Sequence, residues 1–193
     1  MEGKTVAVWK RLEEKEKFHA AIFDVRRVEC EAPGGRRGLF TIVGARDWAI
    51  VVAIAQIEGR PHCLMVRQYR HGADAVFLEF PGGVIERGEE ARAGVLRELE
   101  EETGFKAGRV FHAGTVSPNP AFLENRFHVF VALDIQAGGT VALDDFEELE
   151  PVLVPLAEIR ANMGSGELAN AMMVTGLFLA ERVLARELPS DQG

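Results

Sequence analysis

The stretch of residues 82–105 constrains this chain more than any other part of it. Five residues separate Gly83 from Glu89, and seven more separate Glu89 from the segment Arg97-Glu98-Leu99-Glu100-Glu101-Glu102-Thr103-Gly104-Phe105. Seven fixed positions at a background frequency of about 7% each would coincide by chance in roughly one window in 10⁸. The spacing is therefore specific, even for a glutamate-rich chain.

The same stretch predicts a turn followed by a helix. Pro81-Gly82-Gly83 interrupts an apolar run at 76–80 that is typical of a strand. After Gly88 the periodicity becomes helical, and Gly104 is suited to a C-cap. At about 100° per residue, four residues share a side and should face the core: Val95, Leu96, Leu99 and Thr103.

Carboxylates gather beside the core face of this predicted helix. Glu98 and Glu102 are four residues apart and lie one above the other, with Glu101 close by. Like charges at this spacing cost roughly a few tenths of a kcal/mol, so the cluster needs a partner. Carboxylate oxygens suit Mg²⁺ or Mn²⁺, and Mg²⁺ completes its shell with water and substrate phosphate. Arg97 is placed to pair with Glu101 at i+4 and hold it.

The alternative interpretation is a solvated acidic helix face, which is the usual meaning of a run of glutamates. The turn glycines, the spaced Glu89 and Arg97 favour a metal site over that alternative. Glu90 and Glu100 fall outside the fixed spacing, and for these two we expect ordinary solvated side chains.

The spacing resembles the Nudix box, Gx5Ex7REUxEExGU with U a bulky apolar residue, and every fixed position is filled. The resemblance implies a Nudix-type α/β/α sandwich with a mixed sheet, in which the box forms a loop, a helix and a loop. It also implies that Glu98, Glu101, Glu102 and the main-chain carbonyl of Gly82 bind Mg²⁺, or alternatively Mn²⁺. The implied reaction is metal-assisted attack of water on a diphosphate.

Composition excludes several other classes of protein. A chain of 193 residues with 47% hydrophobic and 27% charged residues suits one ordinary globular domain. A net charge of −8 without a basic cluster argues against nucleic-acid binding. The apolar run at 48–55 is too short to span a membrane, so we expect no membrane contact and a cytoplasmic location. Cys30 and Cys63 have no motif spacing and should be buried, reduced thiols.

Apolar patterning predicts a mixture of strands and helices, which indicates an α/β sandwich. Residues 1–17 suit an edge strand or, alternatively, a partly mobile segment, and 32–38 suit a turn. The predicted strands cover 18–28, 39–43, 48–55, 62–68, 76–80, 110–115, 126–134 and 151–155, and two further helices cover 156–163 and 167–186. We divide the chain into an N-terminal strand extension, 1–43, the main domain, 44–187, and a tail, 188–193.

Beyond the box, residues 18–182 resemble the branch of the family that contains ADP-ribose pyrophosphatases. In that branch an N-terminal strand region crosses to a second subunit, so the similar segment 18–43 implies a homodimer. The segment 66–70 resembles the strand end that supplies a substrate-contacting arginine. The resemblance therefore implies that Arg70 binds substrate, against the alternative of a surface arginine at a strand end.

The loop at 117–126 carries further candidates for substrate contact. Pro120 lies fifteen residues beyond Phe105, a spacing typical of ADP-ribose enzymes. The Pro-Asn-Pro-Ala form departs from the usual Pro-Gly-Phe-Ser-Asp-Glu, which leaves the exact substrate open. Glu124 falls near the acidic substrate or metal contact of the family, or is a solvated loop carboxylate. Phe122 is a candidate to stack on a base, whereas Trp48 opens a buried strand and should belong to the core.

An acidic stretch at 144–150 occupies the position from which related enzymes supply a catalytic carboxylate. A general base must lie within hydrogen-bond reach of the attacking water. Glu147 is the first candidate and Asp145 and Glu148 are the next, against a solvated hairpin tip. The five histidines show no ligand spacing and should be packing or surface residues: His19, His62, His71, His112 and His128.

Together these features predict an Mg²⁺-dependent hydrolase acting on a small nucleotide substrate, with ADP-ribose first, giving AMP and ribose 5-phosphate. Other nucleotide sugars, dinucleotides and oxidised nucleoside triphosphates are rivals within the class. An RNA-cap hydrolase would show a basic surface that this acidic chain lacks. From a different class, the fold could serve as a non-catalytic ADP-ribose sensor, but such a module has no need of a complete set of carboxylates.

Overall fold

The computed structural model describes residues 6–143 and 146–188, which form two compact units. Unit 1 combines the N-terminal residues up to Arg46 with Ser117–Arg126. Unit 2 combines Asp47–Val116 with the residues from Phe127 onward. Unit 2 contains the stretch that dominates the sequence, and its strands and helices carry most of the predicted site.

Unit 2 is built on a seven-stranded sheet with the order β12-β5-β4-β10-β9, to which β6 adds beside β5 and β7 beside β4. The β4–β10 pair is parallel, whereas β4 and β5 are antiparallel, so the sheet is mixed as predicted. The strands are β4 Trp48–Ile57, β5 Arg60–Arg70, β6 Ala75–Glu79, β7 Gly82–Val84, β9 Arg109–Val116, β10 Phe127–Leu133 and β12 Leu149–Pro155.

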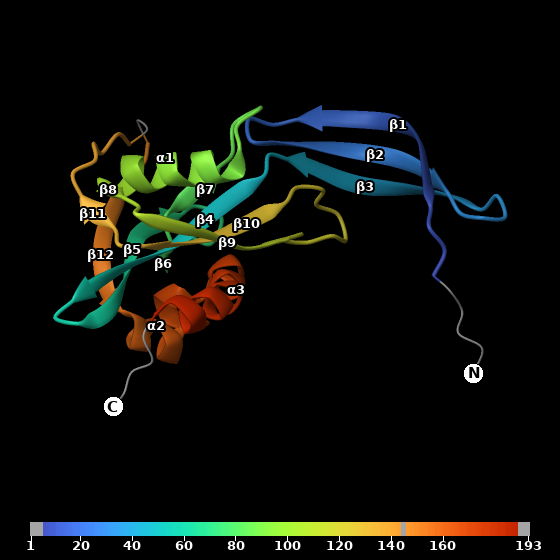
Figure 1. Ribbon diagram of the computed structural model, residues 1–193. Coiled ribbons are helices and arrows are strands. Elements are labelled where there is room, and N and C mark those ends of the chain that lie inside the picture. The colour runs from blue at the N-terminus through green and yellow to red at the C-terminus, as the bar shows by residue number, and fades with distance from the viewer. Residues whose placement is uncertain (1–5, 144–145, 189–193) are drawn as a thin grey trace, which may run out of the picture. The chain divides into compact units, whose positions relative to one another are not determined.

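Helices cover both faces of this sheet, which confirms the α/β/α sandwich (Figure 1). Successive side chains of a strand point to opposite faces, so the buried strand β4 serves both layers. One set packs with Val95 and Leu99 of the first helix: Ala49, Val51 and Ala53. The other set packs with the two C-terminal helices: Ile50, Val52 and Ile54. The helices are α1 Ala91–Thr103, α2 Leu156–Asn162 and α3 Ala171–Glu187.

Side-chain and glycine caps define the ends of α1. The Glu90 carboxylate accepts hydrogen bonds from the amides of Arg92 (3.0 Å) and Ala93 (3.2 Å), and so caps the first turn. Gly104 ends the helix in the left-handed conformation, with φ of 71°, and donates its amide to the Glu100 carbonyl. Glu90 is exposed as predicted, and it has in addition a capping role that was not predicted, because the first amides of a helix lack partners within the helix.

The predicted helix at 167–186 is two elements. A short 3₁₀ turn, η1 Gly166–Leu168, comes first. Asn170 then caps α3, because its side-chain oxygen accepts a hydrogen bond from the Met172 amide at 2.9 Å. A capping residue has an extended backbone, so it separates the two elements. The sequence analysis also missed β7 and the small pair β8 Phe105–Lys106 and β11 Gln136–Ala137.

Unit 1 is an antiparallel sheet of β1 Lys10–His19, β2 Phe23–Glu31 and β3 Arg37–Ala45. The single strand predicted at 18–28 is wrong, because the chain reverses between β1 and β2, where the Ala20 amide donates to the Phe23 carbonyl at 2.9 Å. This turn contains neither glycine nor proline, so it left no turn signal in the sequence. The turn between β2 and β3 was predicted correctly, and Gly34 and Gly35 adopt positive φ there.

Two simpler predictions can be compared with the structure directly. Cys30 and Cys63 are both buried free thiols, as expected, and burial raises the pKa of Cys63. Across 6–143 and 146–188, no helix is long and apolar enough to cross a membrane.

Candidate functional site

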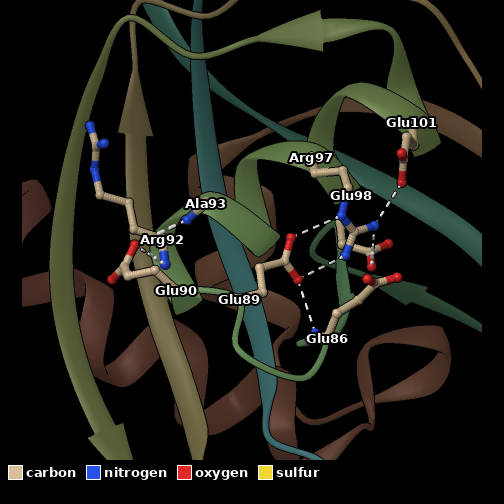
Figure 2. A network of polar contacts seen from close by, with 8 residues as sticks. All are labelled: Glu86, Glu89, Glu90, Arg92, Ala93, Arg97, Glu98 and Glu101. Carbon is tan, nitrogen blue, oxygen red and sulfur yellow. Dashed lines mark hydrogen bonds and ion pairs between the residues drawn. The ribbon is translucent and has the colours of Figure 1, made fainter.

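One guanidinium organises the carboxylates of the box (Figure 2). Arg97 holds Glu89 with two hydrogen bonds, of 3.1 and 3.2 Å, and reaches Glu98 at 3.0 Å and Glu101 at 2.8 Å. The Arg97–Glu101 pair is the one that the helical spacing predicted. The hydrogen bond from Arg97 lowers the pKa of Glu89, with help from the Glu86 amide at 2.9 Å. Glu89 therefore ties the loop before α1 to the middle of the helix.

Glu102 is the most deeply buried carboxylate of the box, with a 6% exposed side chain. Its Oε2 accepts a hydrogen bond of 2.9 Å from the Gly82 amide. Desolvation is the main cause that raises the pKa of Glu102 to about 8; the charges of Glu98 and Glu147 also raise it, whereas Arg70 lowers it. Three acidic groups and one arginine therefore lie close enough to interact electrostatically.

Glu98 lies directly against the backbone of β7. Burial raises the pKa of Glu98, and the neighbouring Arg97 opposes this shift. A Cβ added at Gly83 would lie 2.8 Å from the Glu98 Cδ and 2.9 Å from both of its oxygens. The glycine at this position of the box leaves the space that the Glu98 carboxylate occupies, so a side chain here would displace that carboxylate.

The donor set fits a hard divalent cation. Glu98, Glu101 and Glu102 supply carboxylate oxygens, which Mg²⁺ prefers. Burial raises the pKa of two of them, Glu98 and Glu102, so a cation would stabilise their charged forms. Within the described ranges, no three acidic, histidine or cysteine side chains already converge as metal ligands. Arg97 and the Gly82 amide hold these oxygens instead. Mg²⁺ usually takes only one or two carboxylates, so the residues present are sufficient to bind it. The assignment of individual ligands, including the Gly82 carbonyl, stays a prediction.

The structure describes two of the three candidates for the general base, Glu147 and Glu148. Glu147 lies near enough to raise the pKa of both Glu98 and Glu102. Asp145 lies outside the described residues. Glu148, the residue after Glu147, is exposed, and Phe146, the residue before Glu147, is 97% exposed. The role of Glu147 as base stays a prediction.

The chain that leads to this acidic stretch is fastened to α1. The Ala142 amide donates to the Glu101 carbonyl at 2.9 Å, and the Thr140 amide to the Glu100 carboxylate at 3.3 Å. Glu100 also pairs with Lys106 at 3.3 Å. Glu100 is therefore not an ordinary solvated side chain, because it is half-buried and binds both Lys106 and the Thr140 amide.

Arg70, the predicted substrate contact, stands at the end of β5 and is held by a carboxylate that the sequence analysis did not single out. Its Nε donates to Glu79 at 3.1 Å, and its Nη2 donates to the same oxygen. Glu79 is 1% exposed, and its other oxygen accepts a hydrogen bond of 2.8 Å from Asn170. An acidic residue inside an apolar strand could have indicated this pair, because a buried carboxylate needs a partner.

Pro120, Phe122 and Glu124 belong to unit 1. Phe122 is 44% exposed, and Pro120 is exposed. Glu124 is not simply solvated, because its carboxylate binds Arg26 and, at 3.3 Å, Arg11. Their roles as substrate contacts stay predictions.

Replacing Gly83 with alanine should weaken Mg²⁺ binding by roughly tenfold to a hundredfold, the usual cost of disturbing the surroundings of metal ligands. The added methyl group would displace the Glu98 carboxylate. Isothermal titration calorimetry with MgCl₂ measures this affinity. Gly72→Ala is the matched control, because a Cβ there meets no atom within 4 Å. Equal affinities of Gly83→Ala and wild type would contradict the prediction.

Glu102 should make the metal-free protein less stable as the pH rises from about 4.5 to about 8. Below this window both the folded and the unfolded state are protonated at Glu102. Inside it the folded state keeps a proton that the unfolded state has lost, so the free energy of unfolding falls with rising pH. Glu102→Gln removes this contribution, which urea unfolding in EDTA at several pH values measures. A difference between wild type and variant that does not change with pH would refute the assignment.

Comparison with known proteins places this geometry in a family. Residues 45–172 match the family model described as NUDIX domain. The ADP-ribose pyrophosphatase of Bacillus subtilis (strain 168) is 31% identical over 172 residues, which are 89% of this chain and 88% of the relative. The methanol dehydrogenase activator of Bacillus methanolicus is 29% identical over 150 residues, 77% of this chain and 80% of the relative.

Solved structures give the same result. A crystal structure of an ADP compounds hydrolase superposes with a TM-score of 0.83 at 25% identity, and the match covers 96% of this chain and 99% of that chain. The match includes the α/β/α layers that carry the box. The chain therefore belongs to the Nudix family and is a Nudix hydrolase.

Proposed function

We propose that this Nudix hydrolase cleaves the diphosphate of ADP-sugar substrates with the help of Mg²⁺. The first candidate is ADP-ribose, which gives AMP and ribose 5-phosphate. The observation that carries the proposal is the carboxylate cluster of α1: Arg97 binds Glu98 and Glu101, and the buried Glu102 accepts a hydrogen bond from the Gly82 amide. A divalent cation and a diphosphate would complement these charges. The 31% identity to an ADP-ribose pyrophosphatase supports the choice of substrate.

Each group of the site has a chemical task in this proposal. Glu98, Glu101, Glu102 and the Gly82 carbonyl hold the metal. Bound Mg²⁺ would supply polarisation of the phosphoryl oxygens and activation of water. Arg97 keeps Glu98 and Glu101 in place through its hydrogen bonds of 3.0 and 2.8 Å.

Arg70 and the acidic stretch act on the reacting groups. Arg70 binds a diphosphate oxygen, because a guanidinium offers paired donors that match phosphate. Glu147 accepts the proton of the water that attacks phosphorus, and Asp145 and Glu148 are the next candidates for this task. The bond from that phosphorus to the bridging oxygen breaks, which releases AMP and ribose 5-phosphate.

The loop at 117–126 carries the candidates for recognition of the rest of the substrate. We propose that Phe122 stacks on a base and that Pro120 and Glu124 are further substrate contacts. Other nucleotide sugars and dinucleotides remain rivals, because the Pro-Asn-Pro-Ala form of the loop departs from the usual ADP-ribose form. We place the activity in the cytoplasm. The candidate from a different class is a non-catalytic ADP-ribose sensor that regulates a partner. One relative is named as a methanol dehydrogenase activator, which is a regulatory role of that kind.

Hydrolysis of ADP-ribose with Mg²⁺ should be lost almost completely in Glu102→Gln and strongly reduced in Glu147→Gln. Removing one group that binds the metal or stabilises the reacting phosphate usually lowers the rate by about tenfold to a thousandfold. AMP release, with a panel of nucleotide sugars and dinucleotides in parallel, measures the activity. Glu181→Gln, which loosens an exposed ion pair with Arg160, is the control and should match wild type. Tight ADP-ribose binding without turnover of any compound would exclude the hydrolase and favour the sensor.

We further propose that the chain forms a homodimer through unit 1. The likeness of segment 18–43 to the strand region that crosses between subunits in related enzymes supports this proposal. Three large apolar side chains of unit 1 are exposed and would be available to such an interface: Phe18 at 64%, Ile22 at 76% and Phe40 at 45%. Sedimentation velocity should give the mass of two chains, and Phe18→Ser should weaken the dimer. Phe178→Ser, on α3 and 65% exposed, is the matched control and should remain dimeric. A wild type with the mass of one chain would contradict the proposal.

A further inference from the structure

Glu79 is the most buried charged side chain that the structure describes, at 1% exposed. It lies in β6 between the apolar core residues Leu78 and Phe80. Taking a carboxylate out of water costs roughly several kcal/mol unless its partners replace the lost hydration. A carboxylate at this position therefore needs a specific set of partners, and the identity of those partners indicates its purpose.

Both oxygens of Glu79 are engaged, and by different elements. Oε2 accepts two hydrogen bonds from the Arg70 guanidinium, one of them 3.1 Å from Nε. Oε1 accepts a hydrogen bond of 2.8 Å from the side-chain amide of Asn170. Asn170 is itself fixed, because its oxygen accepts from the Met172 amide at the start of α3. The carboxylate is thus held from the helix side and directed at Arg70.

The pairing of β5 and β6 explains why Arg70 and Glu79 meet. The two strands are antiparallel, with Arg70 opposite Ala75 and Val66 opposite Glu79. Arg70 and Glu79 are thus four positions apart along the pair and lie on the same face, since a face repeats every second residue. The long arginine side chain extends along this face to the carboxylate. Such a bond from Nε and Nη2 fixes the plane of the guanidinium.

This contact orients the guanidinium and leaves part of it available. The Arg70 side chain is 46% exposed, whereas the Glu79 side chain is 1% exposed. Within the described ranges, no other residue forms a hydrogen bond or ion pair with Arg70. The charge of Arg70 also lowers the pKa of Glu102, so it acts at the carboxylate group of the box. A donor edge thus remains free for an anion beside that group.

Arg67 provides the contrast on the same strand. Its partners are Glu150 at 2.6 Å and Glu167 at 3.0 Å, and both of these carboxylates are exposed. Because side chains alternate along a strand, Arg67 and Arg70 point to opposite faces of β5. An exposed pair of this kind contributes little to stability. The buried partner of Arg70 is therefore not a general property of arginines on this strand.

We propose that Glu79, held by Asn170, is a positioning residue that aims the guanidinium of Arg70 at the diphosphate of the substrate. This inference rests on the proposed function of Arg70 and goes beyond it, since it assigns the orientation of that arginine to a buried residue that does not touch substrate. Because Arg70 binds the diphosphate in the substrate and in the reacting state alike, loss of its orientation should raise KM more than it lowers kcat.

The test compares hydrolysis of the best substrate of the panel by wild type, Glu79→Gln, Asn170→Ala, Arg70→Lys and the double variant Glu79→Gln/Arg70→Lys. Glutamine keeps the size of Glu79 but loses its charge. Glu79→Gln should raise KM by up to about a hundredfold, the effect of a misplacement of about 1 Å. Asn170→Ala should raise KM less, and the double variant should be no worse than Arg70→Lys. The Mg²⁺ concentration at half-maximal rate should not change in Glu79→Gln.

Glu167→Gln is the matched control, because it removes a carboxylate from Arg67 of the same strand and should keep the KM of wild type. If Glu79→Gln does not fold, Asn170→Ala decides the question through its smaller rise in KM. An unchanged KM in a folded Glu79→Gln, or losses that add in the double variant, would overturn the inference and leave the proposed function intact. A wild type that neither binds nor hydrolyses any compound of the panel would overturn both.

Discussion

The structure depends on keeping several carboxylates together at the edge of an apolar core. Glu102 is almost fully buried, and Glu98 is largely desolvated by its packing against β7. Such charges are tolerated only where hydrogen bonds and opposite charges replace water. Arg97, the Gly82 amide and Arg70 supply this compensation within the chain. A cation and a diphosphate would extend it, and this is why the family chemistry suits the site.

The backbone around the box is shaped by the same requirement. β7 is three residues long and begins with two glycines, which allow it to approach both β4 and the Glu98 carboxylate. Gly82 adopts a φ of 149°, which other residues rarely adopt, and from there its amide reaches Glu102. Through Gly82 this short strand presents a backbone amide to a carboxylate of α1.

Two further carboxylates extend the arrangement to distant segments. Glu100 fastens the chain that leads to Glu147 onto α1, and Glu79 joins Arg70 to the start of α3. Both lie outside the fixed positions of the box. They differ from the box residues in that their partners come from other elements, so the site consists of a local motif and a set of tertiary bonds that complete it.

Periodicity was enough to predict the helix of the box, its core-facing residues, the Arg97–Glu101 pair and the mixed α/β architecture. These features depend on spacing along one element, where helical and strand periodicity decide which side chains meet. The Glu90 cap and the turn at Ala20 are also local, but glutamate is not among the preferred capping residues and the turn has neither glycine nor proline. The contacts of Glu79 with Arg70 and Asn170 could come only from the folded chain, because strand pairing and packing bring together elements that are distant in sequence.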